Sequence, residues 1–303
     1  MIKRVLITGA NAGLGKETAK QLTNNPQIEK VYLGCRNKEK AQAAKMELEQ
    51  STGKHIFEIL IIDVSNQESV IEAVQKLECS VDALIMNAGG TGGQNFNKLT
   101  PDGVTEIFAV NLLGHCLLTQ ALLKSGKLTQ VAIYAGSEAA RGVKEMGMKR
   151  PHLPTSSEEE FAAICDGSFF GEVKDATIPY GTIKYMGALW MSAMARRHPH
   201  VKFVTMSPGA TTGTEGFNTL PWFKQYFMKS MMRIMLLLNK VHTVEVGANR
   251  YLQGLFNHDL ESGLFYASER GLTGNLSDQS LLFPDLKIER YQENAYLAIQ
   301  RFL

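Results

Sequence analysis

The stretch Val5-Leu6-Ile7-Thr8-Gly9-Ala10-Asn11-Ala12-Gly13-Leu14-Gly15 decides the fold class of this 303-residue chain. An apolar run suited to a buried strand leads into three glycines, and a helical pattern follows at 16–22. A strand, a glycine turn and a helix N-terminus present free backbone N–H groups that can bind a nucleotide pyrophosphate. A glycine motif alone is a weak signal, but the strand before it and the helix after it supply the context that it needs.

The alternation of strand and helix continues over the first two thirds of the chain. Apolar runs typical of strands lie at 4–8, 30–35, 57–62, 82–87, 130–136 and 201–207, with helical patterns at 14–23, 38–50, 66–77, 103–124 and 180–197. Residues 59–62 and 83–86 are apolar throughout, which indicates parallel strands covered on both faces. The sequence predicts an α/β fold, a Rossmann-like, doubly wound parallel sheet. Without a repeat or a low-complexity linker, residues 1–303 are expected to form a single domain.

A second motif, Tyr180-Gly181-Thr182-Ile183-Lys184, lies in the last of these helical patterns. Its phenol and ammonium groups are one helical turn apart on the same face, so Lys184 can act on Tyr180. A free Tyr titrates near pH 10, which is too high for easy proton exchange at neutral pH. We expect the neighbouring cation to lower the pKa of Tyr180. Together the two motifs indicate a nicotinamide-dependent reductase with a Tyr as its acid.

The end of the second predicted strand bears on the choice of cofactor. Enzymes that use the unphosphorylated nicotinamide cofactor usually place an acid there to bind the ribose 2′-hydroxyl. This chain has Cys35-Arg36-Asn37-Lys38 at that point, without an acid. A planar, permanently charged guanidinium suits a 2′-phosphate, so Arg36 favours NADP(H). The alternative is that Arg36 is a solvated surface charge.

Two segments interrupt the alternation, and both follow predicted strand ends, where such sheets bind ligands. Residues 138–179 are an insertion, with a short helix expected at 158–165 that starts at Ser157 with Glu160 three residues on. Residues 212–240 are expected to form a helical substrate lid. Its Met-rich face at 228–235 suits a large apolar substrate or a weak contact with lipid, and a helix packed on the core is the alternative.

Composition limits the partners. Charged residues make up 20% and the net charge is +2, which gives no reason to expect nucleic acid or a charged membrane surface. The four cysteines show no CxxC spacing, so no metal site and no disulfide framework are predicted. The first strand leaves no room for a cleaved leader, and no apolar run reaches the roughly 18 residues of a membrane span. We expect a cytoplasmic protein.

The order of these motifs resembles the short-chain dehydrogenase/reductase family over about residues 1–137 and 180–267. Further matches follow the predicted strands: Asp63, Asn87-Ala88-Gly89, Ser137 and Pro208-Gly209, with Asn111 in the helical segment 103–124. The glycine motif and the string at 110–115 look most like the retinol dehydrogenase branch. The layout beyond Ser137 looks more like light-dependent protochlorophyllide reductases, which share a long insertion before the Tyr and an aromatic segment comparable to 221–225.

The resemblance implies a role for each matched residue. Tyr180 would protonate the substrate, Lys184 would favour the phenolate and hold the nicotinamide ribose, and Ser137 would hydrogen-bond the substrate carbonyl. Asn111 would hold a water that links Lys184 to solvent. The residues implied in cofactor binding are Gly9, Asn11, Ala12, Gly13, Leu14, Gly15, Arg36, Asp63, Val64, Asn87, Ala88, Gly89, Tyr180, Lys184, Pro208, Gly209, Thr211 and Thr212.

One departure from the family pattern follows Gly209. The family commonly has a Thr four positions later, where this chain has Gly213, so Thr211, Thr212 or Thr214 is expected to hold the nicotinamide carboxamide.

A second departure is the long separation of Ser137 from Tyr180. Simple family members have a much shorter one. Ser168 is nearer to Tyr180, but it does not follow a predicted strand, so Ser137 is preferred.

The sequence therefore predicts an NADPH-dependent oxidoreductase that reduces a carbonyl of a fairly large apolar substrate. One alternative is a reductase of carbon–carbon double bonds in a protochlorophyllide-like pigment, suggested by the insertion and the aromatic segment. Another is a nucleotide-binding sensor that has kept the fold without turnover. Many family members pair through the helices that correspond to 103–124 and 180–197, whereas members with large insertions can be monomeric, so a monomer and a homodimer both stay open.

Overall fold

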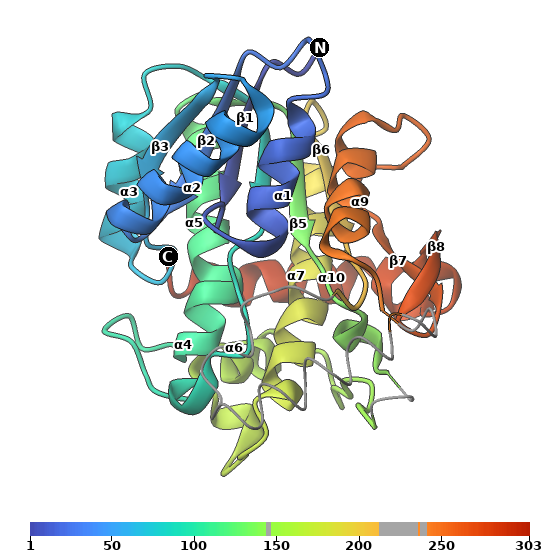
Figure 1. Ribbon diagram of the computed structural model, residues 1–303. Helices are drawn as coiled ribbons and strands as arrows, with labels where there is room; N and C mark the ends of the chain where they lie inside the picture. Colours follow the sequence, from blue (N-terminus) through green and yellow to red (C-terminus); the bar gives the residue numbers. More distant parts are fainter. Residues whose placement is uncertain (144–146, 212–235, 237–240) are drawn as a thin grey trace, which may run out of the picture.

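The computed structural model describes residues 1–143, 147–211, 236 and 241–303, and its sheet has eight strands between two layers of helices (Figure 1). The order is β3 (Phe57–Ile61), β2 (Lys30–Cys35), β1 (Arg4–Thr8), β4 (Val81–Met86), β5 (Leu128–Ala135), β6 (Lys202–Met206), β7 (Phe265–Arg270) and β8 (Thr273–Asp278). Strands β1 to β7 are parallel, and β8 is antiparallel to β7. The strand order reverses between β1 and β4, which is where ligands bind in sheets of this type.

The doubly wound sheet predicted from the sequence is confirmed. Strands β1 to β6 lie within two residues of their expected bounds, because each contains the apolar run that identified it. Val5, Leu6 and Ile7 are fully buried in the centre of the sheet. The sequence did not identify β7 and β8, whose residues at 268–270 and 273–275 are polar or glycine.

The helices cover the two faces of the sheet unequally. Helices α1 (Gly13–Leu22), α2 (Lys38–Thr52) and α9 (Val244–Phe256) pack on one face. Helices α3 (Gln67–Lys76), α5 (Gly114–Lys124) and α7 (Thr177–Arg197) pack on the other, with α6 (Glu158–Asp166) and α10 (Glu289–Gln300) outside α7. Both faces of the strands are therefore apolar, as the uniform runs predicted.

Side-chain caps fix the starts of several helices. Asn37 accepts a hydrogen bond from the N–H of Lys40 at the start of α2, and Asn66 accepts one from Ser69 at the start of α3. Ser157 accepts one from Glu160 at 3.2 Å, so the helix predicted at 158–165 is confirmed as α6. The Glu160 carboxylate in turn accepts hydrogen bonds from the backbone N–H groups of Thr155 and Ser156, which closes the turn before the helix.

The helix expected at 103–124 runs from Glu106 to Lys124 and contains a π turn. A turn at Gly103, which has φ +76°, delays its start, and α4 covers Glu106–Phe108. A π-helical turn, Ala109–Leu113, then carries Asn111 and leads into α5. Single π turns inside α-helices often occur at functional sites. The stretch Glu106–Lys124 is long and apolar enough to cross a membrane by length and composition, and 67% of that window is buried inside the protein.

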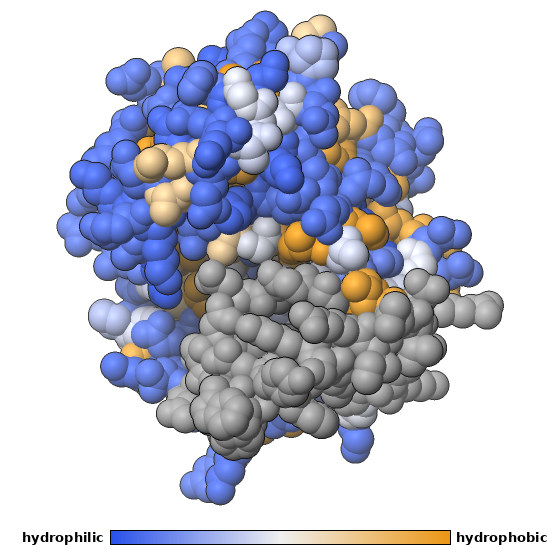
Figure 2. Space-filling view, viewed as in Figure 1, coloured by the Kyte–Doolittle hydropathy of each residue, from blue (hydrophilic) through white to orange (hydrophobic). Residues whose placement is uncertain are grey.

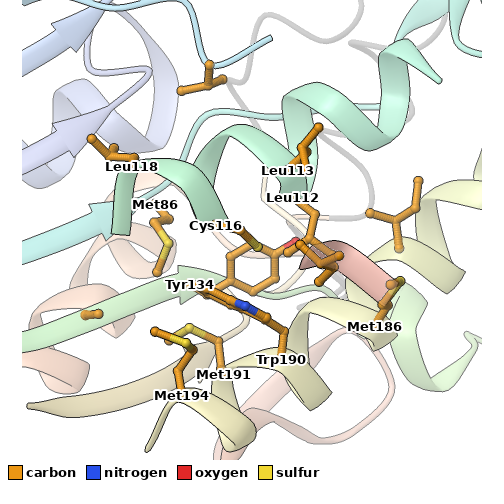
Figure 3. Packing of buried hydrophobic residues seen from close by; sticks show 14 of the residues in the cluster. Met86, Leu112, Leu113, Cys116, Leu118, Tyr134, Met186, Trp190, Met191 and Met194 are labelled. Atoms are coloured by element: carbon orange, nitrogen blue, oxygen red, sulfur yellow. The ribbon is translucent and has the colours of Figure 1, made fainter. Parts of the chain in front are cut away.

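Trp190 and Tyr134 are the largest fully buried side chains of the main core. The Tyr134 ring on β5 lies between Cys116 on α5 and Trp190 on α7 (Figure 3). Large sulfur-containing side chains, among them Met86, Met191 and Met194, fill the remaining gaps around the two rings. Hydrophilic residues cover most of the upper half of the visible surface, and hydrophobic residues gather in a band across its middle (Figure 2).

The two segments that interrupt the alternation differ in how much the structure describes. The insertion contains α6 and the short 3-10 turns Glu138–Arg141 and Ser168–Phe170. Helices α4 and α6 and the start of α7 lie together beyond the carboxyl ends of the central strands (Figure 1). The lid helix expected within 212–240 lies outside the described residues.

Candidate active site

A cavity of about 570 Å³ opens at the carboxyl edge of the sheet, across the point where the strand order reverses. Most of the predicted site residues line it: Gly9, Asn11, Ala12, Gly13, Leu14, Arg36, Asp63, Val64, Asn87, Ala88, Gly89, Ser137, Tyr180, Lys184, Pro208, Gly209 and Thr211. Gly15 and Asn111 do not line the cavity, and Thr212 lies outside the described residues. The cavity thus brings together predicted site residues that are as far apart in the sequence as Gly9 and Thr211.

The glycine turn has the shape that a dinucleotide needs. Gly9 and Gly13 have φ of +66° and +52°, a conformation that other residues rarely adopt. A side chain at Gly15 would lie 2.5 Å from the carbonyl oxygen of Gly9, so α1 can pack this closely only with glycine there. The N-cap of α1 is Ala12, which offers no side-chain acceptor to the first-turn N–H groups. These donors therefore suit an anionic ligand such as a pyrophosphate.

Asn87 holds the turn in place from the neighbouring strand. Its side-chain amide donates to the carbonyl oxygens of Thr8 at 2.9 Å and of Gly9 at 3.3 Å. The Thr8 hydroxyl accepts from the backbone N–H groups of Asn87 and Ala88. The predicted ribose-lining segment is thus tied directly to the strand that precedes the glycines.

Arg36 and Asp63 stand at the far end of the cavity, after β2 and β3. Arg36 is exposed, and no ion pair joins it to another residue among those described. One oxygen of the Asp63 carboxylate accepts from the N–H and hydroxyl of Ser65, which fixes the side chain at the rim. The cavity therefore offers one guanidinium without a carboxylate partner next to the place where a cofactor ribose would lie.

Ser137, Tyr180 and Lys184 meet at the other end of the cavity. Ser137 and Tyr180 both line this end of the cavity, and the Ser137 side chain acts to lower the pKa of Tyr180, although the insertion separates the two in sequence. Ser168, the alternative, lies in a 3-10 turn and does not line the cavity. The Lys184 ammonium donates to the carbonyl oxygen of Ala135 at 2.9 Å and lies 5.6 Å from the centre of the Tyr180 ring.

Burial controls the protonation of Tyr180 and Lys184. It raises the pKa of Tyr180; the nearby Ser137 side chain acts against this rise, and the charge of Glu138 adds to it. Burial also lowers the pKa of Lys184 to about 7. The expectation that Lys184 lowers the pKa of Tyr180 was therefore wrong for this arrangement. Desolvation opposes both charged forms, and it outweighs the other effects on the phenol.

Asn111 lies behind the cavity wall. Its side chain donates to the carbonyl oxygen of Gly90 at 2.7 Å and accepts from the Gly90 N–H at 3.1 Å. A side chain at Gly89 would lie 2.5 Å from its Oδ1 atom. The Asn111 carbonyl oxygen accepts from the Tyr134 hydroxyl at 2.9 Å, with His115 Nδ1 at 3.3 Å. In this structure Asn111 braces the wall at Gly89 and Gly90, and its carbonyl oxygen accepts from Tyr134.

The loop after β6 forms the last wall. Gly209 has φ +77°, and its N–H donates to the Ser207 hydroxyl at 3.2 Å. Thr211 lines the cavity and forms an isolated parallel bridge with His242. Of the three Thr residues considered for the carboxamide, Thr211 is the one that the structure describes.

Sequence reasoning missed several lining residues. Most of them flank the ends of predicted strands, so their position beside a strand end was a usable signal; Tyr251, on α9, had none. The missed residues are Thr8, Gly34, Cys35, Ile62, Gly90, Val110, Ala135, Gly136, Ser207 and Tyr251. Within the described part of the chain, no three His, Cys, Asp or Glu side chains cluster in a way that could hold a metal ion.

Comparison with known proteins agrees with this geometry. The family pattern for short chain dehydrogenases matches residues 3–142. A short chain dehydrogenase, rstn4, from Aspergillus nomiae is 35% identical over 252 residues, which are 80% of this chain and 65% of that protein. Human retinol dehydrogenase 13 is 38% identical over 124 residues, which are 40% of this chain and 36% of that protein. The chain thus spans less than two thirds of the length of these relatives.

A solved structure shares the fold. NADPH-bound carbonyl reductase from chicken fatty liver superposes with a TM-score of 0.58 and 20% identity, covering 90% of this chain and 99% of that one. The sheet, the glycine turn and these matches define an α/β protein with a doubly wound sheet. The chain belongs to the short-chain dehydrogenase/reductase family, and within that family it is similar to the retinol dehydrogenases.

Proposed function

We propose that this protein is an NADPH-dependent reductase of a carbonyl group on a fairly large apolar substrate. The observation that carries the proposal is that Ser137, Tyr180 and Lys184 line the same cavity as the glycine turn. Two hydroxyl groups at one point of the cavity can hold a carbonyl oxygen and supply its proton. The reduced nicotinamide, when bound, supplies the hydride to the carbonyl carbon.

Three residues of this chain would each have a separate role in the reduction. Ser137 would orient the carbonyl oxygen, and Tyr180 would donate its proton to that oxygen as the alcohol forms. The raised pKa of Tyr180 keeps the phenol protonated at neutral pH, which is the state that a proton donor in reduction needs. Lys184, within reach of the phenol ring, would hold the ribose and return a proton to Tyr180.

NADP(H) is favoured over NAD(H) by the charges after β2. Arg36 has no carboxylate partner among the described residues, and the adjacent residues include no acid that would repel a 2′-phosphate. The structurally similar carbonyl reductase from chicken fatty liver was solved with NADPH bound, which supports NADP(H) by analogy.

The apolar substrate class rests on the likeness to retinol dehydrogenases. A single domain, a cytoplasmic location and a monomeric or dimeric state remain predictions; cell fractionation and light scattering would test the last two.

The test is NADPH oxidation by the purified protein against aldehydes, ketones and retinal, with conjugated enones and protochlorophyllide as a second group. We expect turnover of an apolar aldehyde or ketone that yields the alcohol, and little turnover with NADH. Turnover of the second group alone, with reduction of the C=C bond, would replace the carbonyl proposal. Tight NADPH binding without turnover of either group would favour a sensor.

A further inference from the structure

A carboxylate lies buried directly beside Ser137. Glu138 is 4% exposed and forms an ion pair with Arg250 of α9, which is 3% exposed, at 3.6 Å. Burying two charges is costly, and well-packed apolar residues in their place are often as stable or more so. The pair belongs to none of the sequence motifs, so its presence next to the cavity needs another explanation.

Glu138 ties the end of β5 to the ends of β6 and β7. One carboxylate oxygen accepts from the Ser207 hydroxyl at 2.5 Å. The other accepts from the backbone N–H of Ser268 at 3.2 Å and from its hydroxyl at 3.0 Å. The Ser207 hydroxyl accepts in turn from the Gly209 N–H, so the carboxylate acts on the Pro208–Gly209 loop through one intermediate atom.

Arg250 holds the same loop from the other side. Its Nη1 donates to the carbonyl oxygen of Ser207 at 3.2 Å and to the Ser268 hydroxyl at 3.1 Å. Its Nη2 donates to the carbonyl oxygen of Gly274 at 2.7 Å and to His242 Nε2 at 2.9 Å. The Ser207 side chain thus donates a hydrogen bond to the Glu138 carboxylate, and its backbone carbonyl accepts one from the Arg250 guanidinium.

Gly209 is fitted against this pair. A side chain there would lie 2.5 Å from His242 Cδ2 and 3.1 Å from Arg250 Nη1, and φ is +77°. The N–H of His242 donates to the carbonyl oxygen of Ala210 at 2.6 Å. The Pro208–Gly209 loop therefore cannot move toward α9 without a steric clash. Its position in the cavity depends on the position of the ion pair.

We propose that Glu138 and Arg250 are positioning residues that fix the spacing between the Ser137 turn and the Pro208–Gly209 loop. Both of these segments line the cavity, on two different walls. The inference rests on the proposed function, in which one wall orients the carbonyl and the other holds the nicotinamide. If two buried charges set this spacing, they keep the nicotinamide and the substrate carbonyl at the distance that hydride transfer needs. A misplacement of the reacting atoms by about 1 Å can lower the rate about 100-fold.

Glu138 also acts on Tyr180 through its charge. The pH dependence of kcat therefore tests the proposal, because a purely structural role of Glu138 would leave it unchanged. Its negative charge raises the pKa of Tyr180. The other titratable groups around the phenol are Lys184 on the same helix, Tyr134 on β5 and Tyr251 on α9. Reduction needs the protonated phenol, so removing the charge of Glu138 should move the alkaline limit of kcat to lower pH.

The experiment compares Glu138→Gln with Glu293→Gln, the same change in the ion pair with Arg197 that joins α10 to α7. For Glu138→Gln we expect kcat to fall by about 10- to 100-fold, with a lower alkaline limit of its pH profile. The dissociation constant of NADPH, measured by fluorescence, should rise several-fold, and amide exchange in residues 203–210 should become faster in the protein alone. Glu293→Gln should change none of these.

A third variant covers the case in which Glu138→Gln does not fold. Ser207→Ala keeps the ion pair and removes only its hydroxyl link to the loop, so the same changes should appear in weaker form. Variants that melt at a lower temperature but keep the wild-type kcat, pH limit, NADPH affinity and amide exchange would overturn the proposal. If the wild-type protein reduces no substrate, the proposed function fails by itself, while NADPH affinity and amide exchange still decide whether the pair positions the loop.

Discussion

The Tyr134 ring packs against α7 because residue 187 is glycine. A side chain at Gly187 would overlap the ring, with a carbon 2.7 Å from Tyr134 Cζ and 2.8 Å from its hydroxyl oxygen. The ring reaches across to donate its hydroxyl to the Asn111 carbonyl oxygen, and the Lys184 ammonium lies 4.7 Å from its centre. Gly187 therefore determines what surrounds Lys184, one turn earlier on the same helix.

Gly187→Ala should destabilise the protein even though alanine is the better helix former. The helix gains about 1 kcal/mol from the substitution, but displacing a fully buried ring costs about 1–3 kcal/mol. We expect a net loss in urea unfolding together with a lower activity. Gly254→Ala in α9 is the matched control, since a side chain there meets the flexible end of Ile133. A Gly187→Ala variant more stable than wild type would contradict the packing described here.

The pH dependence of stability should report on the buried Lys184. Its pKa is about 7 in the folded protein and 10.5 ordinarily, so the unfolded chain binds more protons between these values. Folding stability therefore rises with pH across this window, by up to about 1.4 kcal/mol per pH unit. Below pH 7 the lysine is charged in both states, and its full desolvation cost opposes folding.

Lys184→Met isolates this effect, because methionine keeps the length of the side chain without the charge. The unfolding free energy of wild type relative to the variant should rise between pH 7 and pH 9.5 in urea titrations. The same comparison for Lys76→Met, at an exposed position, serves as the control. A difference between wild type and Lys184→Met that stays flat across this range would show that Lys184 remains charged in the folded state.

Tyr180→Phe tests the assignment of the proton donor. Removing the phenol oxygen should lower kcat by about 100- to 10,000-fold, the range for loss of a general acid, while the dissociation constant of NADPH changes little. Tyr185→Phe is the matched control: its hydroxyl donates to Asp285 at 2.6 Å, and Tyr185 is not among the cavity-lining residues. If Tyr180→Phe turns over at the wild-type rate, another group gives the proton.

The sequence predicted the parts of this molecule that depend on local patterns. Six strands each contain an apolar run, and the glycine turn and the Tyr180–Lys184 pair are defined by spacing along the chain. Strands β7 and β8 were missed because the polar residues in them give no such run. The Glu138–Arg250 pair was hidden because Glu138 begins a polar insertion and Arg250 lies on α9, more than 100 residues away, so each charge looks solvated by itself. Tyr134 and Gly187 meet only through the packing of β5 on α7, which no local pattern encodes.

The choice between the two nicotinamide cofactors should depend on Arg36. A charged hydrogen bond contributes about 1.5–3 kcal/mol, so Arg36→Ala should raise the KM for NADPH by about 10- to 100-fold and leave that for NADH nearly unchanged. Arg36→Asp should go further, because a carboxylate repels the 2′-phosphate and can accept a hydrogen bond from a free 2′-hydroxyl. The kcat/KM ratio for the two cofactors measures the effect, with Lys40→Ala, a nearby exposed charge, as the control. A ratio that stays the same in both Arg36 variants would make Arg36 a solvated surface charge and remove the main argument for NADPH.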